Sequence, residues 1–200
     1  MQKNTTKIIV SILVLVAIIF FVGVFVHAAV YAPDDEATPS PALAALAKKQ
    51  ANLPGHSALL SIPALSINAK VQEVGITTKG NIGTPNNFTD VGWYKYGPLP
   101  GNNGTAVIDG HVDNGLALPG VFKHLGNIKL GNDVYIITKE GKQLHFIVTD
   151  IATYDYNAPT DQIFKQSDTP TLLLITCAGT WVNEIGTHNK RLVVTTTLVS

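Results

Sequence analysis

The chain has one cysteine, Cys177, and this residue is the strongest candidate for chemistry in the sequence. It ends the apolar run TLLLITC, which predicts a buried strand that ends at the cysteine and mounts it at the mouth of a site. Ala178 and Gly179 follow and leave room for a ligand beside the sulfur, where a thiolate would be a strong nucleophile. Lone cysteines are also often buried as small hydrophobic residues, so this stretch alone leaves both interpretations open.

Arg191 is the only arginine in the sequence, against thirteen lysines, and it lies fourteen residues after Cys177. A lysine would supply positive charge as well as an arginine does. A guanidinium adds several donors fixed in one plane, which suits the binding of a carbonyl oxygen or an oxyanion. The use of a single arginine at this position therefore indicates such a task.

His111 is a candidate general acid or base, because it follows the predicted strand GTAVIDG in the sequence DGHVD. A strand end lets an imidazole project into a groove, and Gly110 permits close packing of the backbone. The chain has six histidines, and none of the other five has so compact a setting between glycine and aspartate.

Other uses of these residue types fit their spacing less well. The sequence has no second cysteine and no His-Glu-x-x-His motif, so a zinc site would need ligands from scattered positions. The glycine-rich GPLPGNNG has two prolines and lacks the Lys-Ser or Lys-Thr ending of a phosphate loop. We therefore expect no metal and no cofactor.

The first predicted region, residues 1–30, is a cytoplasmic tip and a membrane anchor. Lys3 and Lys7 precede an apolar stretch at residues 8–30, which is long enough to span a bilayer and longer than the apolar core of a typical cleaved signal. The acidic run DDE follows at residues 34–36, so the charge bias places the N-terminus in the cytoplasm and the remaining chain outside. Small residues around the end of the span, in AAVYA, also permit cleavage.

Residues 31–56 are rich in alanine and proline and are predicted to be an extracellular linker. Within them, Ser40 and Pro41 predict the N-cap and first position of a short helix. Residues 57–200 are enough for one folded domain. Apart from Lys3 and Lys7, the chain carries 12 basic and 14 acidic residues, so nothing indicates a nucleic-acid partner.

Short apolar and alternating runs in residues 57–200 predict seven or eight strands and little helix. The runs are ALLSI, LSINAKV, GTAVIDGH, DVYIIT, QLHFIVTDIATY, TLLLIT and RLVVTTTLV. Turn-forming segments separate them, and only GVFKHLG and TDQIFKQ suggest brief helices. The expected fold class is all-β, as a closed or nearly closed β-barrel that leaves no exposed strand edges.

The order His111 in GHVD, Cys177 in LLLITCAG and Arg191 in NKRLVVTT, with spacings of 66 and 14 residues, resembles the sortase family. The resemblance starts at SIPALSINAKVQEVG and covers essentially all of residues 57–200. LITCAG and GHVD are most similar to the class E and class F sortases. In the family motif Thr-Leu-x-Thr-Cys, Leu173 replaces the first threonine, whereas the remaining fixed positions match.

The resemblance implies a sortase-type barrel of about eight strands with one or two short helices, behind a single transmembrane helix. It also implies a cysteine transpeptidase in which Cys177 cleaves an LPxTG-like sorting signal between threonine and glycine and forms a thioacyl enzyme. His111 would protonate the leaving amine and deprotonate the incoming one, and Arg191 would hold the oxyanion. The implied partners are proteins with C-terminal sorting signals and an amine acceptor of a cell-wall precursor or a pilin.

Thr176, Ala178 and Trp181 are the implied substrate-binding residues, although Trp181 could equally cap the barrel. The resemblance predicts that residues 156–169 flank the peptide groove and that residues 178–190 border the path of the acceptor. It also predicts a single-pass protein of the cell membrane whose catalytic domain is extracellular.

Two other classes of protein compete with this interpretation. An L,D-transpeptidase is a different wall cysteine transpeptidase, but the Ser-His-Gly-Cys run of that class is absent here. A non-enzymatic, surface-displayed β-barrel binding module with a buried Cys177 would fit the strand pattern equally well. An unpaired thiol outside the cell favours catalysis over this second alternative.

Overall fold

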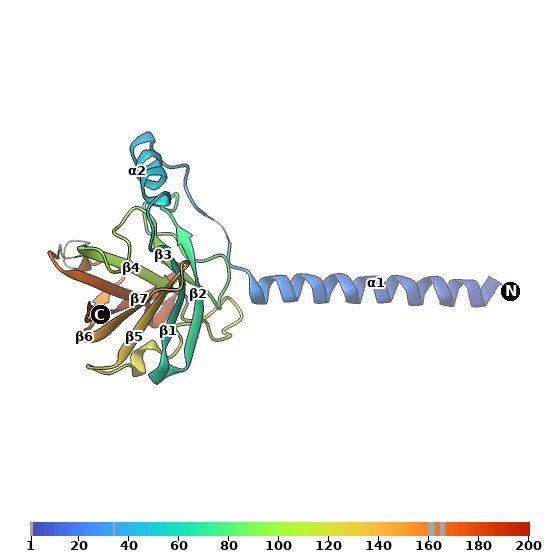
Figure 1. Ribbon diagram of the computed structural model, residues 1–200. Helices are drawn as coiled ribbons and strands as arrows, with labels where there is room; N and C mark the ends of the chain where they lie inside the picture. Colours follow the sequence, from blue (N-terminus) through green and yellow to red (C-terminus); the bar gives the residue numbers. More distant parts are fainter. Residues whose placement is uncertain (1, 34, 160–162, 165–166) are drawn as a thin grey trace.

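The computed structural model describes residues 2–33, 35–159, 163–164 and 167–200. The described part of the chain forms one closed barrel with a long helix that extends away from it (Figure 1). The helices are α1 (Gln2–Val30), α2 (Pro41–Ala51) and the short 3-10 turns η1 (Pro63–Leu65) and η2 (Leu125–Asn127). The strands are β1 (Ser57–Ile62), β2 (Ile67–Val74), β3 (Val91–Tyr94), β4 (Gly104–Gly110), β5 (Asp133–Thr138), β6 (Gln143–Asp155), β7 (Pro170–Val182) and β8 (Thr187–Leu198).

The strands close in the order β1-β2-β3-β4-β7-β8-β6-β5, which confirms the predicted all-β barrel. The pairs β2/β3 and β4/β7 are parallel, and the other neighbours are antiparallel. Because the barrel is closed, each strand pairs with a neighbour on both sides, and none of the apolar strands is left at an open sheet edge. Strands β4, β7 and β8 lie side by side; β7 carries Cys177, β8 carries Arg191, and His111 directly follows β4.

The inward-facing side chains fill the barrel with a single core. Trp93, Phe122 and Phe146 are the largest fully buried residues, and β7 adds Leu172 and Leu174 to the same cluster. Burying a large apolar side chain contributes roughly 1.5–3 kcal/mol. Strand β7 is therefore held firmly between β4 and β8 and is a rigid support for the residues on its outer face.

Strand β7 differs from its prediction, because it continues past Cys177 to Val182. The pairing register with β8 shifts between Ala178 and Trp181, where Gly179 has a φ of 75°. A left-handed glycine lets the strand bulge there and then resume its pairing. The prediction that the strand ends at the cysteine was therefore wrong.

Two further predictions need correction. Strand β3 was missed, because four residues that include Gly92 are too short to show an alternating pattern. The brief helix predicted around GVFKHLG is present only at its end, where the 3-10 helix η2 begins at Leu125, and the residues before it form turns. The predicted helix around residues 160–166 lies for the most part outside the described residues.

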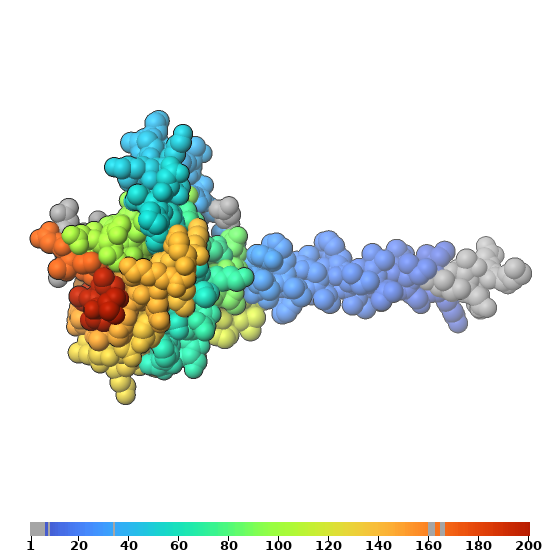
Figure 2. Space-filling view, in the orientation of Figure 1, coloured from blue at the N-terminus to red at the C-terminus, as the bar shows by residue number. Residues whose placement is uncertain are grey.

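Helix α1 contains a stretch, Ile9–Val30, that is long and apolar enough to cross a membrane. At about 1.5 Å per residue, such a helix matches the thickness of the hydrocarbon layer. Figure 2 shows α1 standing clear of the barrel, so its apolar side chains are not covered by the rest of the protein. These features support a membrane anchor.

The segment predicted as a linker, residues 31–56, contacts the barrel in several places. The Ala32 amide donates to the carbonyl oxygen of Asn86 at 3.0 Å, and Glu36 forms an ion pair with Lys95. His56 is buried, with 7% of its surface exposed. The composition of this segment suggests a free spacer, whereas the structure shows contacts with the barrel both before and after helix α2.

Helix α2 forms where the sequence predicts it, within this segment. Ser40 is its N-cap, and the Ser40 hydroxyl accepts a hydrogen bond from the Leu43 amide at 3.4 Å. The Gln50 side-chain amide donates to the carbonyl oxygen of Gly97 at 2.9 Å and ties the end of the helix to the barrel. The helix buries no residue fully, so polar contacts hold it in place.

Candidate active site

Cys177 and Arg191 are direct partners in the antiparallel pair of β7 and β8. Side chains directly opposite each other in such a pair point to the same face, with Cβ atoms about 4.5–5.5 Å apart. Leu172 and Leu174 of β7 face the core, so the alternation of a strand sends Leu173 and Cys177 to the outer face. The sulfur and the guanidinium therefore share the outer surface of the barrel.

His111 reaches the same region because β4 ends beside Cys177. Strand β4 runs parallel to β7, with Asp109 opposite Ile175, and His111 directly follows the strand. The Thr176 hydroxyl donates to the carbonyl oxygen of Gly110 at 2.8 Å in a buried hydrogen bond. This bond joins the residue before the cysteine to the residue before the histidine. Thr176 is buried, and its predicted contact with substrate stays a prediction.

The His111 ring is oriented by two neighbours that sequence reasoning missed. Its Nε2 lies 3.1 Å from the carbonyl oxygen of Pro85, and the Phe88 ring packs against it at a centroid distance of 4.8 Å. A carbonyl only accepts, so Nε2 carries a proton and Nδ1 is the free acceptor of the neutral ring. Burial lowers the pKa of His111, against opposing contributions from Pro85 and Asp113, which favours this neutral form.

The Arg191 guanidinium is fixed by the chain that precedes it. Its Nη1 donates to the carbonyl oxygens of His188 and Lys190 at 2.9 and 2.8 Å, and its Nη2 donates to the Thr187 hydroxyl at 3.1 Å. A guanidinium has five N–H donors. In the part of the chain that the structure describes, two of them therefore remain for another acceptor, and their directions are set in advance.

The surroundings of Cys177 oppose its ionisation in the free protein. Burial raises the pKa of the thiol, whereas the positive charge of Arg191 and the Thr187 hydroxyl act in the opposite direction. The carboxylates of Asp109 and Asp113 raise the thiol pKa further. The resting site at neutral pH thus pairs a protonated thiol with a neutral imidazole, and Arg191 is the group that favours the thiolate.

A cavity of about 250 Å³ opens beside Cys177. It lies where residues 176–179 of β7 meet the loop after His111. Its lining residues are Val112, Asp113, Phe122, Lys123, Gly126, Thr176, Cys177, Ala178, Gly179, His188 and Leu192. Two of the three predicted substrate-binding residues, Thr176 and Ala178, belong to this wall.

Trp181, the third predicted substrate-binding residue, lies on the part of β7 beyond the bulge. Its side chain is exposed, and its indole N–H donates to the Asn183 side chain at 2.9 Å. The ring packs edge to face against His188 at a centroid distance of 5.5 Å, and His188 lines the cavity. The exposed position does not fit a cap on the barrel core, so the structure leaves Trp181 free to meet a ligand.

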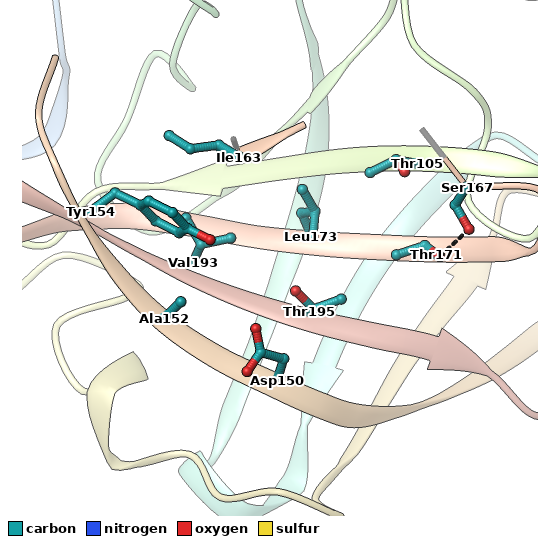
Figure 3. Close-up of a pocket in the computed structure, with 10 residues that line it drawn as sticks. All are labelled: Thr105, Asp150, Ala152, Tyr154, Ile163, Ser167, Thr171, Leu173, Val193 and Thr195. Atoms are coloured by element: carbon teal, nitrogen blue, oxygen red, sulfur yellow. Dashed lines mark hydrogen bonds between the residues drawn. The ribbon is translucent and has the colours of Figure 1, made fainter. Parts of the chain in front are cut away.

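A second cavity, of about 230 Å³, lies on the outer face of the barrel (Figure 3). Its lining residues come mainly from β4, β6, β7 and β8 and are Thr105, Asp150, Ala152, Tyr154, Ile163, Ser167, Thr171, Leu173, Val193 and Thr195. Leu173 and Val193 lie at its centre, and the Thr171 hydroxyl donates to that of Ser167 at 3.0 Å. Leu173 and Cys177 point to the same face of β7, so this cavity and the sulfur lie on the same face of the strand.

Asp109 is a buried acidic residue on the Cys177 face that sequence reasoning missed. Its Oδ1 is buried and has no hydrogen-bond partner among the described residues. The carboxyl lies over Gly92, where an added Cβ would come within 2.5 Å of Oδ1. Burial raises the pKa of Asp109 well above its ordinary value. No local pattern in the sequence signals this, because it depends on the pairing of β3 with β4.

The unpartnered Asp109 predicts a pH-dependent gain in stability for Asp109→Asn. The folded protein holds the Asp109 proton more tightly than the unfolded chain, so stability falls as pH rises above the unfolded pKa, about 3.9. Asparagine removes this loss. The variant should melt at a higher temperature than the unaltered protein at about pH 7, and the difference should shrink toward about pH 4. Thermal unfolding followed by circular dichroism tests this, and a gain of equal size at both pH values would contradict it.

A protein-family model described as a sortase domain matches residues 60–199. Among solved structures, sortase C-1 from Actinomyces oris has a TM-score of 0.60 and 23% identity, covering 84% of each chain. A lid mutant of sortase A from Corynebacterium diphtheriae has a TM-score of 0.59 and 23% identity, covering 82% of this chain and 81% of that one. The sortase D5 transpeptidase from Clostridium perfringens has a TM-score of 0.55 and 19% identity, covering 77% and 87%. No curated protein matches significantly in sequence.

Proposed function

The chain belongs to the sortase family of cysteine transpeptidases, and we propose that it cleaves an LPxTG-like sorting signal between threonine and glycine. The released protein is transferred through a thioacyl intermediate to an amine of a cell-wall precursor or a pilin. The observation that carries this proposal is the direct pairing of Cys177 with Arg191, next to a β4 end that brings in His111.

Acylation begins with a proton transfer from the Cys177 thiol to Nδ1 of His111. The thiolate attacks the carbonyl carbon of the signal threonine, and the carbonyl oxygen becomes an oxyanion. The two uncommitted N–H groups of Arg191 receive this oxyanion. His111 then gives its proton to the leaving glycine nitrogen, which leaves a thioester on Cys177.

The cavity on the outer face of the barrel is the proposed seat of the sorting signal. An extended peptide along β7 would pass over Leu173 and Val193 and reach Cys177 with its threonine carbonyl. Ile163 and Ser167 line the same cavity and come from the 156–169 region that was predicted to flank the groove. An apolar floor with polar hydroxyls at its margin suits a short peptide with apolar and polar side chains.

Helix α1 would hold the enzyme in the cell membrane, with residues beyond it outside the cell. The lysines before the span and the acidic residues after it support this orientation. Sorting signals and acceptor amines meet at the outer face of the membrane, where a barrel attached to such an anchor would lie. The LITCAG and GHVD sequences support a place in the class E or class F branches.

Incubation with a mixed library of sorting-signal peptides and amines tests the substrate. We expect mass spectrometry to detect one family of LPxTG-like peptides cut after threonine and joined to the amine. Cys177→Ala should abolish both products, because no other thiol exists in the chain. Product formation by a folded Cys177→Ala protein would exclude the mechanism, and no cleavage of any peptide by the unaltered protein would favour the binding-module alternative.

Arg191→Lys tests whether planar donors, and not charge alone, hold the oxyanion. Lysine keeps the positive charge near the sulfur, but its three donors lack the planar array with which Arg191 binds the His188 and Lys190 carbonyls and keeps two N–H groups for an oxyanion. Loss of an oxyanion donor typically lowers kcat by about 10²–10³. We expect at least about a hundredfold loss of turnover in steady-state cleavage assays. Nearly full turnover would show that charge is sufficient.

A further inference from the structure

Asp113 is an acidic residue that lines the same cavity as Cys177. Its Oδ2 is 3.5 Å from Lys123 Nζ and 3.6 Å from His188 Nε2, so both contacts are long. Its Oδ1 makes no hydrogen bond or ion pair within the described residues. The side chain is 22% exposed. The carboxylate is thus accessible from the cavity and has capacity for another cation.

The backbone around Asp113 is fixed, which holds the carboxylate in place. Asp113 forms a bridge with Pro119, and the Gly120 amide donates to the carbonyl oxygen of Val112 at 3.0 Å. An added Cβ on Gly120 would lie 2.4 Å from the carbonyl oxygen of His111, so this turn packs directly against the histidine. A ligand bound by Asp113 would therefore lie close to both His111 and Cys177.

The charge of Asp113 is a disadvantage for the first half of the reaction. A carboxylate beside the sulfur opposes thiolate formation, and burial already raises the pKa of the Cys177 thiol. A site that needs a thiolate gains nothing from this carboxylate during acylation. The second half differs, because the acceptor amine reaches the thioester mostly as an ammonium ion at neutral pH.

We propose that Asp113 binds the ammonium group of the acceptor in the Cys177 cavity and positions it for attack on the thioester. The inference rests on the proposed function and adds an acceptor-binding residue to it. The ligand chemistry is a primary ammonium, on the N-terminus of a peptide or on a lysine side chain. His188 and Lys123 hold the second carboxylate oxygen, and Oδ1 faces the acceptor.

The transfer step conserves protons and electron pairs. The ammonium bound to Asp113 loses one proton to water in the cavity and becomes an amine. The nitrogen lone pair forms a bond to the thioester carbon, and the carbon–sulfur bond breaks with its electron pair leaving on the Cys177 sulfur. Nδ1 of His111 takes the second nitrogen proton, so the products are an amide, a thiolate and an imidazolium.

The test compares acceptors that differ in charge, using the full-length protein in detergent and a sorting-signal peptide that it cleaves. Triglycine amide and Nα-acetyl-lysine amide are cationic acceptors and represent the two sources of ammonium. Hydroxylamine is uncharged at neutral pH and serves as the neutral nucleophile. For each, the KM of the acceptor and the ratio of transfer to hydrolysis are measured by mass spectrometry.

Asp113→Asn should raise the KM of the cationic acceptors about tenfold or more, since a charged hydrogen bond contributes about 1.5–3 kcal/mol. The KM of hydroxylamine should change less than about twofold, because hydroxylamine carries no charge for Asp113 to bind. If the KM rises for only one of the two cationic acceptors, Asp113 recognises the kind of ammonium group that this acceptor carries, either a peptide N-terminus or a lysine side chain. Asp113→Glu keeps the charge and should recover part of the preference for cationic acceptors.

Asp109→Asn is the matched control. It also replaces a buried acidic residue near Cys177, but Asp109 does not line the cavity. Asp113→Asn should acylate faster than the unaltered protein, and only Asp113→Asn should lose cationic acceptors. Normal acylation with unchanged acceptor KM in Asp113→Asn, or an equal effect on hydroxylamine, overturns the assignment to Asp113. Failure of the unaltered protein to acylate with any sorting peptide overturns the proposed function and this inference with it.

Discussion

The antiparallel pairing of β7 with β8 is the constraint on which the site depends. It sets Cys177 directly opposite Arg191 and holds both on the outer face of a closed barrel. The core residues Leu172 and Leu174 lock β7 from the inside, and the Thr176 hydroxyl fixes the end of β4 beside it. Three side chains separated by 66 and 14 residues in sequence thus converge through ladder hydrogen bonds and one buried side-chain bond.

The electrostatics of the site follow from this packing. Burial keeps both the thiol and the imidazole neutral, and the backbone carbonyls of His188 and Lys190 hold the guanidinium of Arg191, the strand partner of Cys177. A fixed cation next to a buried thiol stabilises charge that appears during attack, without a large rearrangement at that moment. Asp113 lines the same cavity as the sulfur, and in our proposal it binds the cationic acceptor there.

The sequence predicts an element well when the residues of that element alone determine its structure. Long apolar runs such as TLLLIT predicted β7, and Ser40 with Pro41 predicted the start of α2. Four-residue β3 was missed because its stability comes from pairing with β2 and β4. The continuation of β7 was missed because Gly179 alone looks like an ending, whereas pairing with β8 carries the strand through the bulge.

The same reasoning explains which site features were predicted. The types and order of His111, Cys177 and Arg191 are visible in the sequence, and the family resemblance links them to one reaction. The roles of Pro85 and Asp109 depend on contacts between distant segments, and no local pattern encodes those contacts. The position of Asp113 in the cavity is of the same kind, although the residue itself lies in the GHVD sequence.

Formation of a thioester on Cys177 is the most direct test of this account. The protein would be mixed with a cleavable sorting-signal peptide in the absence of amine, quenched in acid at short times, digested and analysed by mass spectrometry. The account predicts a peptide fragment ending in threonine attached to the segment that contains Cys177, and its release by added amine. Cleaved peptide without any acyl group on Cys177 at any time would contradict the account.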